Sequence, residues 1–421
     1  MKVLMISGVF YPKINGAVIA VSNMMRSLSA RGNQVTLVTR RDKGSAPLEN
    51  WNGAKVVRVG RPGYAVTARV SLGFEQFRAA LKIARADPPD VIHAHGFTSL
   101  LAGAALGISI GRPVVVSFHG IQRLWSAKAR WRSETTLQFM LPFEKILLKL
   151  TRRVLSQSEL LKGIVLQVYG VPSSKVTVVP NPIDVRTFKY GLPQQGDRPI
   201  VLFVGSLMKV HGPDVLLDSM PSVLRSHPEA KAVLVGKGPL RGPLMERIAE
   251  LGLGDSAEML DEIRDPEELS EVYRTSRVVV IPLRYTGYIL SLVGEEAMAS
   301  GRPVVTTMTL DEELSDFGVL KAGGTGDSLG DVISSVLSWD DARYEQVSRS
   351  AREYAEKRFS FEAVGGQLER IYKEVILNAS GNGRVSSAKR STGAGSSIGS
   401  VIALTRSLQS YGEGVGGQCS R

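Results

Sequence analysis

Short apolar runs alternate with amphipathic stretches along this chain of 421 residues. The runs Lys2–Ser7, Asp90–His95 and Pro113–Ser117 are rich in Val and Ile, a composition typical of buried strands. Residues 18–31 instead place apolar side chains three or four positions apart, as an amphipathic helix does. Strand, helix and strand in this order predict a parallel sheet in an α/β fold.

The same order returns in the second half of the chain. Pro199–Val204 and Ala232–Val235 read as strands, and a segment rich in Gly, Pro and Gln, Gly191–Arg198, precedes them. A chain of this length is too long for one ordinary core. We therefore predict two α/β domains joined by this linker.

The most informative stretch follows the apolar run Val278–Pro282, which reads as a buried strand. A loop over Leu283–Val293 leads into a helix predicted at Gly294–Ser300, and another strand follows. Ligands of parallel sheets bind at the carboxyl ends of strands, near helix N-termini. The loop amides and the first helical turn could hold an anion there, and Glu295 or Glu296 could accept hydrogen bonds from hydroxyls.

Charge is distributed unevenly. Residues 1–195 carry 27 Lys and Arg against 9 Asp and Glu, whereas residues 196–378 carry 20 against 30. The remaining 43 residues are basic again, and the net charge is +12. A basic first half suggests an anionic partner, and nucleic acid and anionic lipid both fit. A solvated basic surface that serves solubility explains the same numbers.

Cysteine content and hydropathy limit the compartment. The single cysteine, Cys419, allows no internal disulfide, which favours a reducing compartment. The first run is too short for a signal peptide, and the apolar run near Leu100–Ile110 is too short to span a bilayer. We expect a cytoplasmic protein that could still touch the inner face of the membrane.

Three histidines stand at strand ends. His93 and His95 are two positions apart and should face the same side of their strand. No third ligand is evident, so no metal site is predicted. His119 ends the next strand, where it could bond a ligand hydroxyl or assist charge development. A capping or core histidine is the alternative.

Residues 120–153 are basic and aromatic. Lys and Arg are interleaved with Trp125, Trp131, Phe139 and Phe143. Such a segment can lie at a membrane interface, or it can stack on and neutralise nucleic acid. An ordinary surface helix with its Leu and Ile face inward is the third interpretation.

The run Glu296-Ala-Met-Ala299, continued by Gly301 and Pro303-Val-Val305, resembles the core motif of retaining GT-B glycosyltransferases of family four. The order of motifs extends the resemblance over about residues 1–376. It implies two Rossmann-like domains, an interdomain cleft and a C-terminal helix that crosses back to the first domain. It also implies sugar transfer from a UDP- or GDP-linked donor with retention of configuration, and no cofactor.

The resemblance also implies roles for individual residues. His119 corresponds to the histidine near the transferred sugar and is the predicted catalytic residue, and Glu296 corresponds to the glutamate that holds the ribose. Three positions depart from the family pattern. Tyr288 replaces a donor-contacting glutamate, Ser206 an arginine and His211 a lysine. The remaining predicted donor-binding residues are Gly16 and Lys209 for phosphate and the amides of Leu290, Ser291 and Leu292.

Together these observations predict a glycosyltransferase with a lipid-linked or membrane-associated acceptor and no nucleic-acid partner. Because Tyr288 departs from the motif, the alternative is a weakly active or inactive homologue that serves as a binding or regulatory subunit. The predicted regions are an acceptor-binding domain at 1–190, a nucleotide-sugar domain at 199–358, a crossover helix at 359–378 and a disordered tail at 379–421.

Overall fold

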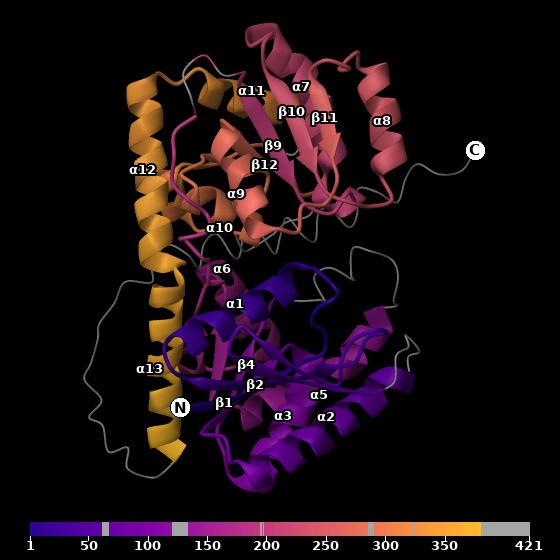
Figure 1. The fold of residues 1–421 in the computed structure, drawn as a ribbon, viewed down its shortest axis with the longest axis vertical. Coiled ribbons are helices and arrows are strands. Elements are labelled where there is room, and N and C mark those ends of the chain that lie inside the picture. The colour runs from indigo at the N-terminus through magenta and orange to yellow at the C-terminus, as the bar shows by residue number, and fades with distance from the viewer. Residues whose placement is uncertain are drawn as a thin grey trace.

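Two β-sheets, each flanked by helices, lie one above the other in the computed structural model (Figure 1). The structure describes residues 1–60, 67–119, 134–193, 196, 198–284, 290–323 and 326–379. Within these ranges the side chains of 67–71, 134–140 and 327 are not described.

The first sheet has eight strands in the order β3-β4-β2-β1-β5-β6-β7-β8, and all neighbours are parallel except β3 and β4. The strands are β1 Lys2–Ser7, β2 Gln34–Arg40, β3 Leu48–Trp51, β4 Ala54–Val59, β5 Val91–His95, β6 Val114–Ser117, β7 Arg153–Ser156 and β8 Val176–Val178. The strands at the centre of this sheet are buried on both faces, which explains their runs of Val and Ile.

Helices cover the first sheet on both sides. They are α1 Gly16–Ala30, α2 Thr67–Ala86, α3 Phe97–Ile110, α5 Glu134–Leu150 and α6 Glu159–Tyr169, with a short 3₁₀ turn, η1, at Ser173–Lys175. Helix α3 approaches the sheet closely, because a Cβ atom added at Gly107 would lie 2.4 Å from Val114 Cγ2. Close packing at this glycine holds α3 over β5 and β6.

The second sheet has six parallel strands in the order β11-β10-β9-β12-β13-β14. They are β9 Ile200–Val204, β10 Lys231–Val235, β11 Ala257–Leu260, β12 Val278–Ile281, β13 Val304–Thr306 and β14 Val319–Lys321. The helices are α7 Pro213–Ser226, α8 Arg241–Glu250, α9 Pro266–Thr275, α10 Leu292–Ala299 and α11 Gly326–Leu337, with 3₁₀ turns η2 Lys209–His211 and η3 Glu312–Phe317.

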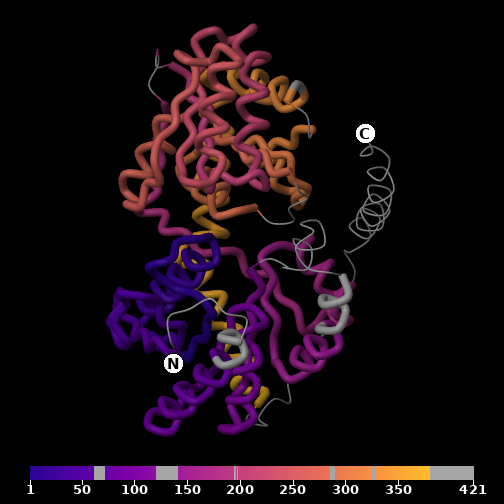
Figure 2. Tube along the Cα trace, turned by 90° about the vertical axis from the view of Figure 1, so that its right-hand side faces the viewer, coloured from indigo at the N-terminus to yellow at the C-terminus, as the bar shows by residue number. Residues whose placement is uncertain are grey.

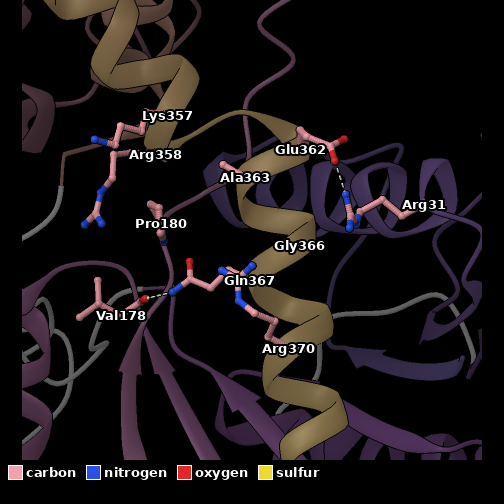
Figure 3. A pocket seen from close by; sticks show the side chains of 10 residues that line it. All are labelled: Arg31, Val178, Pro180, Lys357, Arg358, Glu362, Ala363, Gly366, Gln367 and Arg370. Carbon is pink, nitrogen blue, oxygen red and sulfur yellow. Dashed lines mark hydrogen bonds and ion pairs between the residues drawn. The ribbon is translucent and has the colours of Figure 1, made fainter.

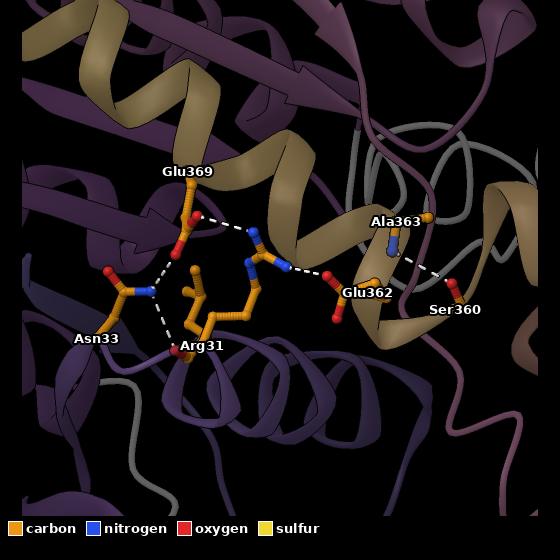
Figure 4. A network of polar contacts seen from close by, with 7 residues as sticks. Arg31, Asn33, Ser360, Glu362, Ala363 and Glu369 are labelled. Carbon is orange, nitrogen blue, oxygen red and sulfur yellow. Dashed lines mark hydrogen bonds and ion pairs between the residues drawn. The ribbon is translucent and has the colours of Figure 1, made fainter.

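Two long helices connect the domains along one side of the molecule. Helix α12, Asp341–Arg358, lies against the second domain, and α13, Phe361–Ala379, runs down along the first domain and packs against α1 (Figures 1 and 2). Arg31 of the first domain pairs there with Glu362 and with Glu369, the latter at 3.1 Å (Figure 4). The predicted arrangement of two domains and a returning helix is confirmed.

Some element boundaries differ from the expectations. Helix α10 begins at Leu292 rather than at Gly294, because buried apolar contacts of Leu292 outweigh the helix-breaking tendency of the glycine. Ala379 belongs to α13 rather than to the tail. The antiparallel strand β3 is missing from the sequence prediction, since Leu48–Trp51 lacks an apolar alternation.

Candidate active site

Segments that follow strands of one sheet contact segments that follow strands of the other. Gly16, which begins α1 after β1, lies against α10, since a Cβ added there would be 3.8 Å from Leu292 Cδ1. The amides of Glu159 and Leu160 donate to the carboxylate of Asp311 at 3.2 and 3.1 Å. The carboxyl edges of the two sheets therefore meet at the domain interface.

Three histidine rings stand in a row at this edge of the first sheet. The ring centroids of His93 and His95 are 4.2 Å apart, which confirms that both face the same side of β5. His93 is bonded on both ring nitrogens, to Tyr372 and Ser117, at 2.7 Å each. His95 Nδ1 lies 2.9 Å from His119 Nε2. His93 is thus a satisfied core histidine, while His95 and His119 extend the row toward the interface.

Burial keeps these rings neutral. It lowers the pKa of His93 to about 3 and the pKa of His119 to about 4, and it lowers the pKa of His95 well below its usual range. Neighbouring rings add to the shift for His93 and His95. At neutral pH the His119 imidazole is therefore neutral, and it can form hydrogen bonds but carries no positive charge. Groups of three or more side chains suited to a metal ion are absent from the part of the chain described here.

A chain of side-chain amides connects His119 with the second domain. Gln157 Nε2 lies 3.4 Å from His119 Nδ1 and also donates to the side-chain oxygen of Asn181. Asn181 in turn donates to the carboxyl group of Glu295 on α10, from Nδ2 at 3.0 Å and from its backbone N at 3.4 Å. Three strand ends and one helix of the other domain are therefore coupled by hydrogen bonds.

Glu295 is the acid at the end of this hydrogen-bond path. It is 2% exposed, and burial raises its pKa well above the usual range of a carboxyl group. The hydrogen bonds from Asn181 oppose this shift, and nearby Glu296 adds to it. Three buried polar atoms in or beside this network have no hydrogen-bond partner among the described residues: His95 Nε2, Gln157 Oε1 and Ser291 Oγ. Unpaired buried polar atoms are costly unless a ligand or water pairs with them.

Glu296 lies on the inner side of α10. It is 6% exposed and accepts a hydrogen bond of 2.9 Å from the hydroxyl of Tyr273 on α9. Burial raises its pKa to about 7, and the bond from Tyr273 opposes the shift. Of the two glutamates that the sequence offers, Glu295 contacts the first domain and Glu296 is held by the second. The ribose-binding role of Glu296 stays a prediction.

The N-terminus of α10 presents backbone donors that have no acceptor among the described residues. These are the amides of Leu290, Ser291 and Leu292. Leu290 and Leu292 bury their side chains, and Ser291 is the N-cap. Free amides at the start of a helix favour negative charge. This is the geometry that the predicted donor-binding role of the three residues requires.

Glycines let the loops of the second sheet pack backbone against backbone. A Cβ atom at Gly212, where φ is +67°, would lie 1.9 Å from the carbonyl oxygen of Pro282. At Gly236, with φ +152°, it would lie 1.9 Å from the carbonyl oxygen of Gly205. Any side chain at these two positions would push apart the ends of β9, β10 and β12.

Basic side chains flank these loops. Lys209 is exposed in η2, and burial lowers the pKa of its neighbour His211, which favours the neutral ring. Arg284, directly after β12, bonds through its backbone N to Val210 at 3.1 Å and pairs with Asp214 through its side chain. Sequence analysis overlooked Arg284, although an arginine just after a buried strand is a signal of the kind used for His119.

The sequence matches two glycosyltransferase families in succession. Residues 14–187 match the family described as Glycosyltransferase Family 4, and residues 198–338 match Glycosyl transferases group 1. The two matches cover the two sheets in turn. The chain belongs to the group 1 glycosyltransferases of family 4.

Similar proteins span between about two thirds and nine tenths of this glycosyltransferase. An uncharacterized glycosyltransferase of Methanocaldococcus jannaschii is 26% identical over 400 residues, covering 89% of this chain and 98% of the relative. A D-inositol 3-phosphate glycosyltransferase of Segniliparus rotundus is 25% identical over 313 residues, covering 68% and 66%. The structure of Anabaena HepE in complex with UDP has a TM-score of 0.69 at 18% identity, covering 89% and 100%. The structural likeness supports the GT-B fold.

Several predicted features of the glycosyltransferase lie outside the described residues. Tyr288 is one, as are Trp125 and Trp131 of the basic aromatic segment and the tail from residue 380. Ser206 is exposed in the loop after β9. Within the described ranges, helices that combine the length and the hydropathy needed to cross a bilayer are not found.

Proposed function

We propose that this glycosyltransferase moves a sugar from a nucleotide sugar, UDP- or GDP-linked, to a hydroxyl acceptor with retention of anomeric configuration. The observation that carries the proposal is the meeting of Gly16 and the N-terminus of α10 at the carboxyl edges of both sheets. The free amides there suit a diphosphate, and HepE, a protein of the same fold, binds UDP.

The diphosphate would lie between Gly16 and the amides of Leu290–Leu292. Lys209 and Arg284, which flank the loops of the second sheet, are candidates for countercharge. Arg284 would replace the charge that the motif loses at Ser206 and His211. Each charge-assisted contact of this kind contributes about 1.5–3 kcal/mol. Glu296 would accept hydrogen bonds from the ribose hydroxyls.

The sugar would lie beside the histidine row. His119 is neutral, and a sugar hydroxyl that replaces the long 3.4 Å contact between Gln157 Nε2 and His119 Nδ1 would be bonded and positioned there. Glu295 is not suited to act as a nucleophile while burial favours its protonated form, and Glu296 is assigned to the ribose hydroxyls. We infer that the bond from C1 to the leaving phosphate breaks as the acceptor oxygen attacks from the same side. The acceptor proton passes to the leaving diphosphate, which gives retention without an enzyme-bound sugar.

The acceptor is proposed to be membrane-borne. Helix α5 exposes Phe143, Ile146 and Leu150, which are 43%, 56% and 44% exposed and share one stripe by their spacing of three and four. Lys145 and Lys149 flank this stripe. Apolar side chains bordered by lysines are typical of helices that lie at an anionic bilayer surface.

The test measures release of nucleoside diphosphate from a panel of UDP- and GDP-sugars. The acceptors are vesicles with anionic lipid, soluble inositol phosphate, or none, and product stereochemistry is read by NMR. Turnover that needs vesicles supports the full proposal. Turnover with inositol phosphate alone supports sugar transfer but shows that the acceptor is soluble. Nucleotide binding without turnover under any condition would favour the binding-subunit alternative, which Tyr288→Glu would then probe by creating activity.

A matched pair of variants tests the membrane stripe. Ile146→Ser should reduce sedimentation with anionic vesicles several-fold, whereas Ile108→Ser, which removes an equally apolar exposed side chain from α3, should not. Equal sedimentation of both variants and the unmodified chain would remove α5 from the proposal.

A further inference from the structure

A basic cavity lies on the side of the molecule where the chain crosses between the domains. Its volume is about 380 Å³. Four basic side chains line it, Arg31, Lys357, Arg358 and Arg370, against one acid, Glu362 (Figure 3). The cavity is formed where α12 ends and α13 begins, away from the histidine row and from α10.

Three of the four cations lack an acidic partner. Arg31 is already engaged, because it pairs with Glu362 and with Glu369 (Figure 4). Lys357, Arg358 and Arg370 have no carboxylate within ion-pair distance in the described part of the chain. Unbalanced positive charge in a concave site attracts and concentrates anions.

A hydrogen bond holds one wall of the cavity in place, and a glycine without a side chain forms part of another. Gln367 on α13 donates to the carbonyl oxygen of Val178 at 2.7 Å, which ties α13 to the end of β8. Gly366 faces the cavity without a side chain. A Cβ atom added there would lie 3.7 Å from Arg31 Cζ and 3.8 Å from Arg370 Nη1. A larger side chain at this position would therefore occupy the space next to two guanidinium groups.

The cavity touches two of the segments that cross between the domains, the α12–α13 junction and the passage that follows β8. Lys357 and Arg358 end α12, Arg370 lies on α13, and Val178 and Pro180 belong to the passage out of the first sheet. The next residue, Asn181, donates to Glu295 at the domain interface. A ligand in the cavity would hold these segments together and contact the residue next to the interface network.

We propose that this cavity binds a phosphorylated small molecule, a phosphate monoester or phosphate itself, at a site separate from the sugar-transfer site. Guanidinium groups bind phosphate oxygens in pairs, and Arg358 and Arg370 bring two of them to opposite walls. The volume suits a ligand of a few carbon atoms with one phosphate group. The proposal does not depend on the identity of the sugar donor.

The test is calorimetric titration of the full chain with glycerol 3-phosphate and with inorganic phosphate at constant ionic strength. We expect a dissociation constant below about 1 mM for glycerol 3-phosphate, for inorganic phosphate or for both. Arg358→Ala and Arg370→Ala should each weaken it roughly 10- to 100-fold, as the loss of a charge-assisted contact does. Tighter binding of the ester than of phosphate identifies an ester ligand, and equal binding identifies phosphate.

Two further variants separate this cavity from other anion sites. Gly366→Leu keeps every charge and should abolish binding by filling the cavity, with an unchanged melting temperature showing that the chain is folded. Arg349→Ala removes the same charge from the exposed face of α12, outside the cavity, and should bind as tightly as the unmodified chain. Unchanged binding by Gly366→Leu, or no binding by the unmodified chain up to about 10 mM, overturns the proposal.

Discussion

The domains are joined at two places whose chemistry is opposite. At the interface, the neutral amide of Asn181 donates hydrogen bonds to Glu295, whose pKa burial raises well above the usual range of a carboxyl group. At the crossover, Arg31 meets Glu362 and Glu369 through ion pairs. The first contact is buried, and the second is partly exposed, with Glu362 83% exposed. The contribution of the first contact to the unfolding free energy should depend on pH and little on salt. The contribution of the second should depend on salt.

The difference reflects what each place does. A buried ion pair must recover a desolvation cost of several kcal/mol per ion, which neutral partners avoid. The side chain of Asn181 can therefore be buried at the interface while its oxygen and its nitrogen both form hydrogen bonds. At the crossover, water screens the charges and reduces both the cost and the gain of pairing. Four predictions test this contrast.

The largest effect is expected from Asn181→Asp, which replaces a hydrogen-bond donor with a second acid next to Glu295. Two buried acids cannot share the contact when both are ionised, so we expect a loss of about 3 kcal/mol in unfolding free energy at pH 8. The loss should shrink at pH 5, where one acid is protonated. Urea denaturation at both pH values measures it, and an equal loss at both would contradict the neutral interface.

Arg31→Gln tests the ionic side of the contrast. It removes both ion pairs at the crossover and should lower the unfolding free energy by about 1–2 kcal/mol at low salt, because hydrogen bonds to charged groups contribute about that much. In 1 M salt the difference from the unmodified chain should fall by half or more. A difference in unfolding free energy that does not change with salt would show that Arg31 stabilises the chain mainly by packing against Gly365 and Gly366.

The pKa of Glu296, raised by burial to about 7, predicts pH-dependent nucleotide binding. Ribose hydroxyls donate to the carboxylate, so binding favours the ionised form and should strengthen as pH rises through 7. Below pH 7 the affinity for UDP should fall about tenfold per pH unit, as the ionised fraction does. Glu296→Gln should bind weakly and without this dependence. A flat profile in the unmodified chain would remove Glu296 from the ribose site.

Glu295→Gln should have the smallest effect on stability at pH 4, less than about 1 kcal/mol, since it imitates the protonated acid. The sign of the pH effect follows from the raised pKa of Glu295. In the unmodified chain the stability contributed by the protonated acid is present below the unfolded pKa, about 4.3, and is lost as pH rises from there to the folded pKa. The variant should therefore become progressively more stable than the unmodified chain as pH rises above 4. Thermal unfolding from pH 4 to 8 measures this divergence.

Sequence patterns predicted the domain organisation and most elements because buried strands and amphipathic helices leave strong local signals. The first strand is an example, since the apolar run Lys2–Ser7 forms β1 with the predicted bounds. The strand β3 left no such signal. Its four residues pair with β4 through backbone bonds that any sequence without proline can make.

Candidate site residues divide in the same way. Gly16, His119 and Glu296 could be identified because they sit at strand ends and helix starts, places that local sequence specifies. Gln157 and Arg284 occupy equivalent places but became candidates only through their partners, Asn181 and Asp214, which are distant in sequence.

The sequence by itself determined two α/β domains, their strand ends and a family motif, because those depend on periodicity and on residues close together in the chain. Tertiary structure alone decided that His93 is a core residue and that Glu295 rather than Glu296 bonds to Asn181 of the first domain. It also decided that three cations without a carboxylate partner among the described residues meet at the crossover. Burial, pKa and charge balance depend on neighbours that folding brings from hundreds of positions away. Local pattern carries no record of those neighbours.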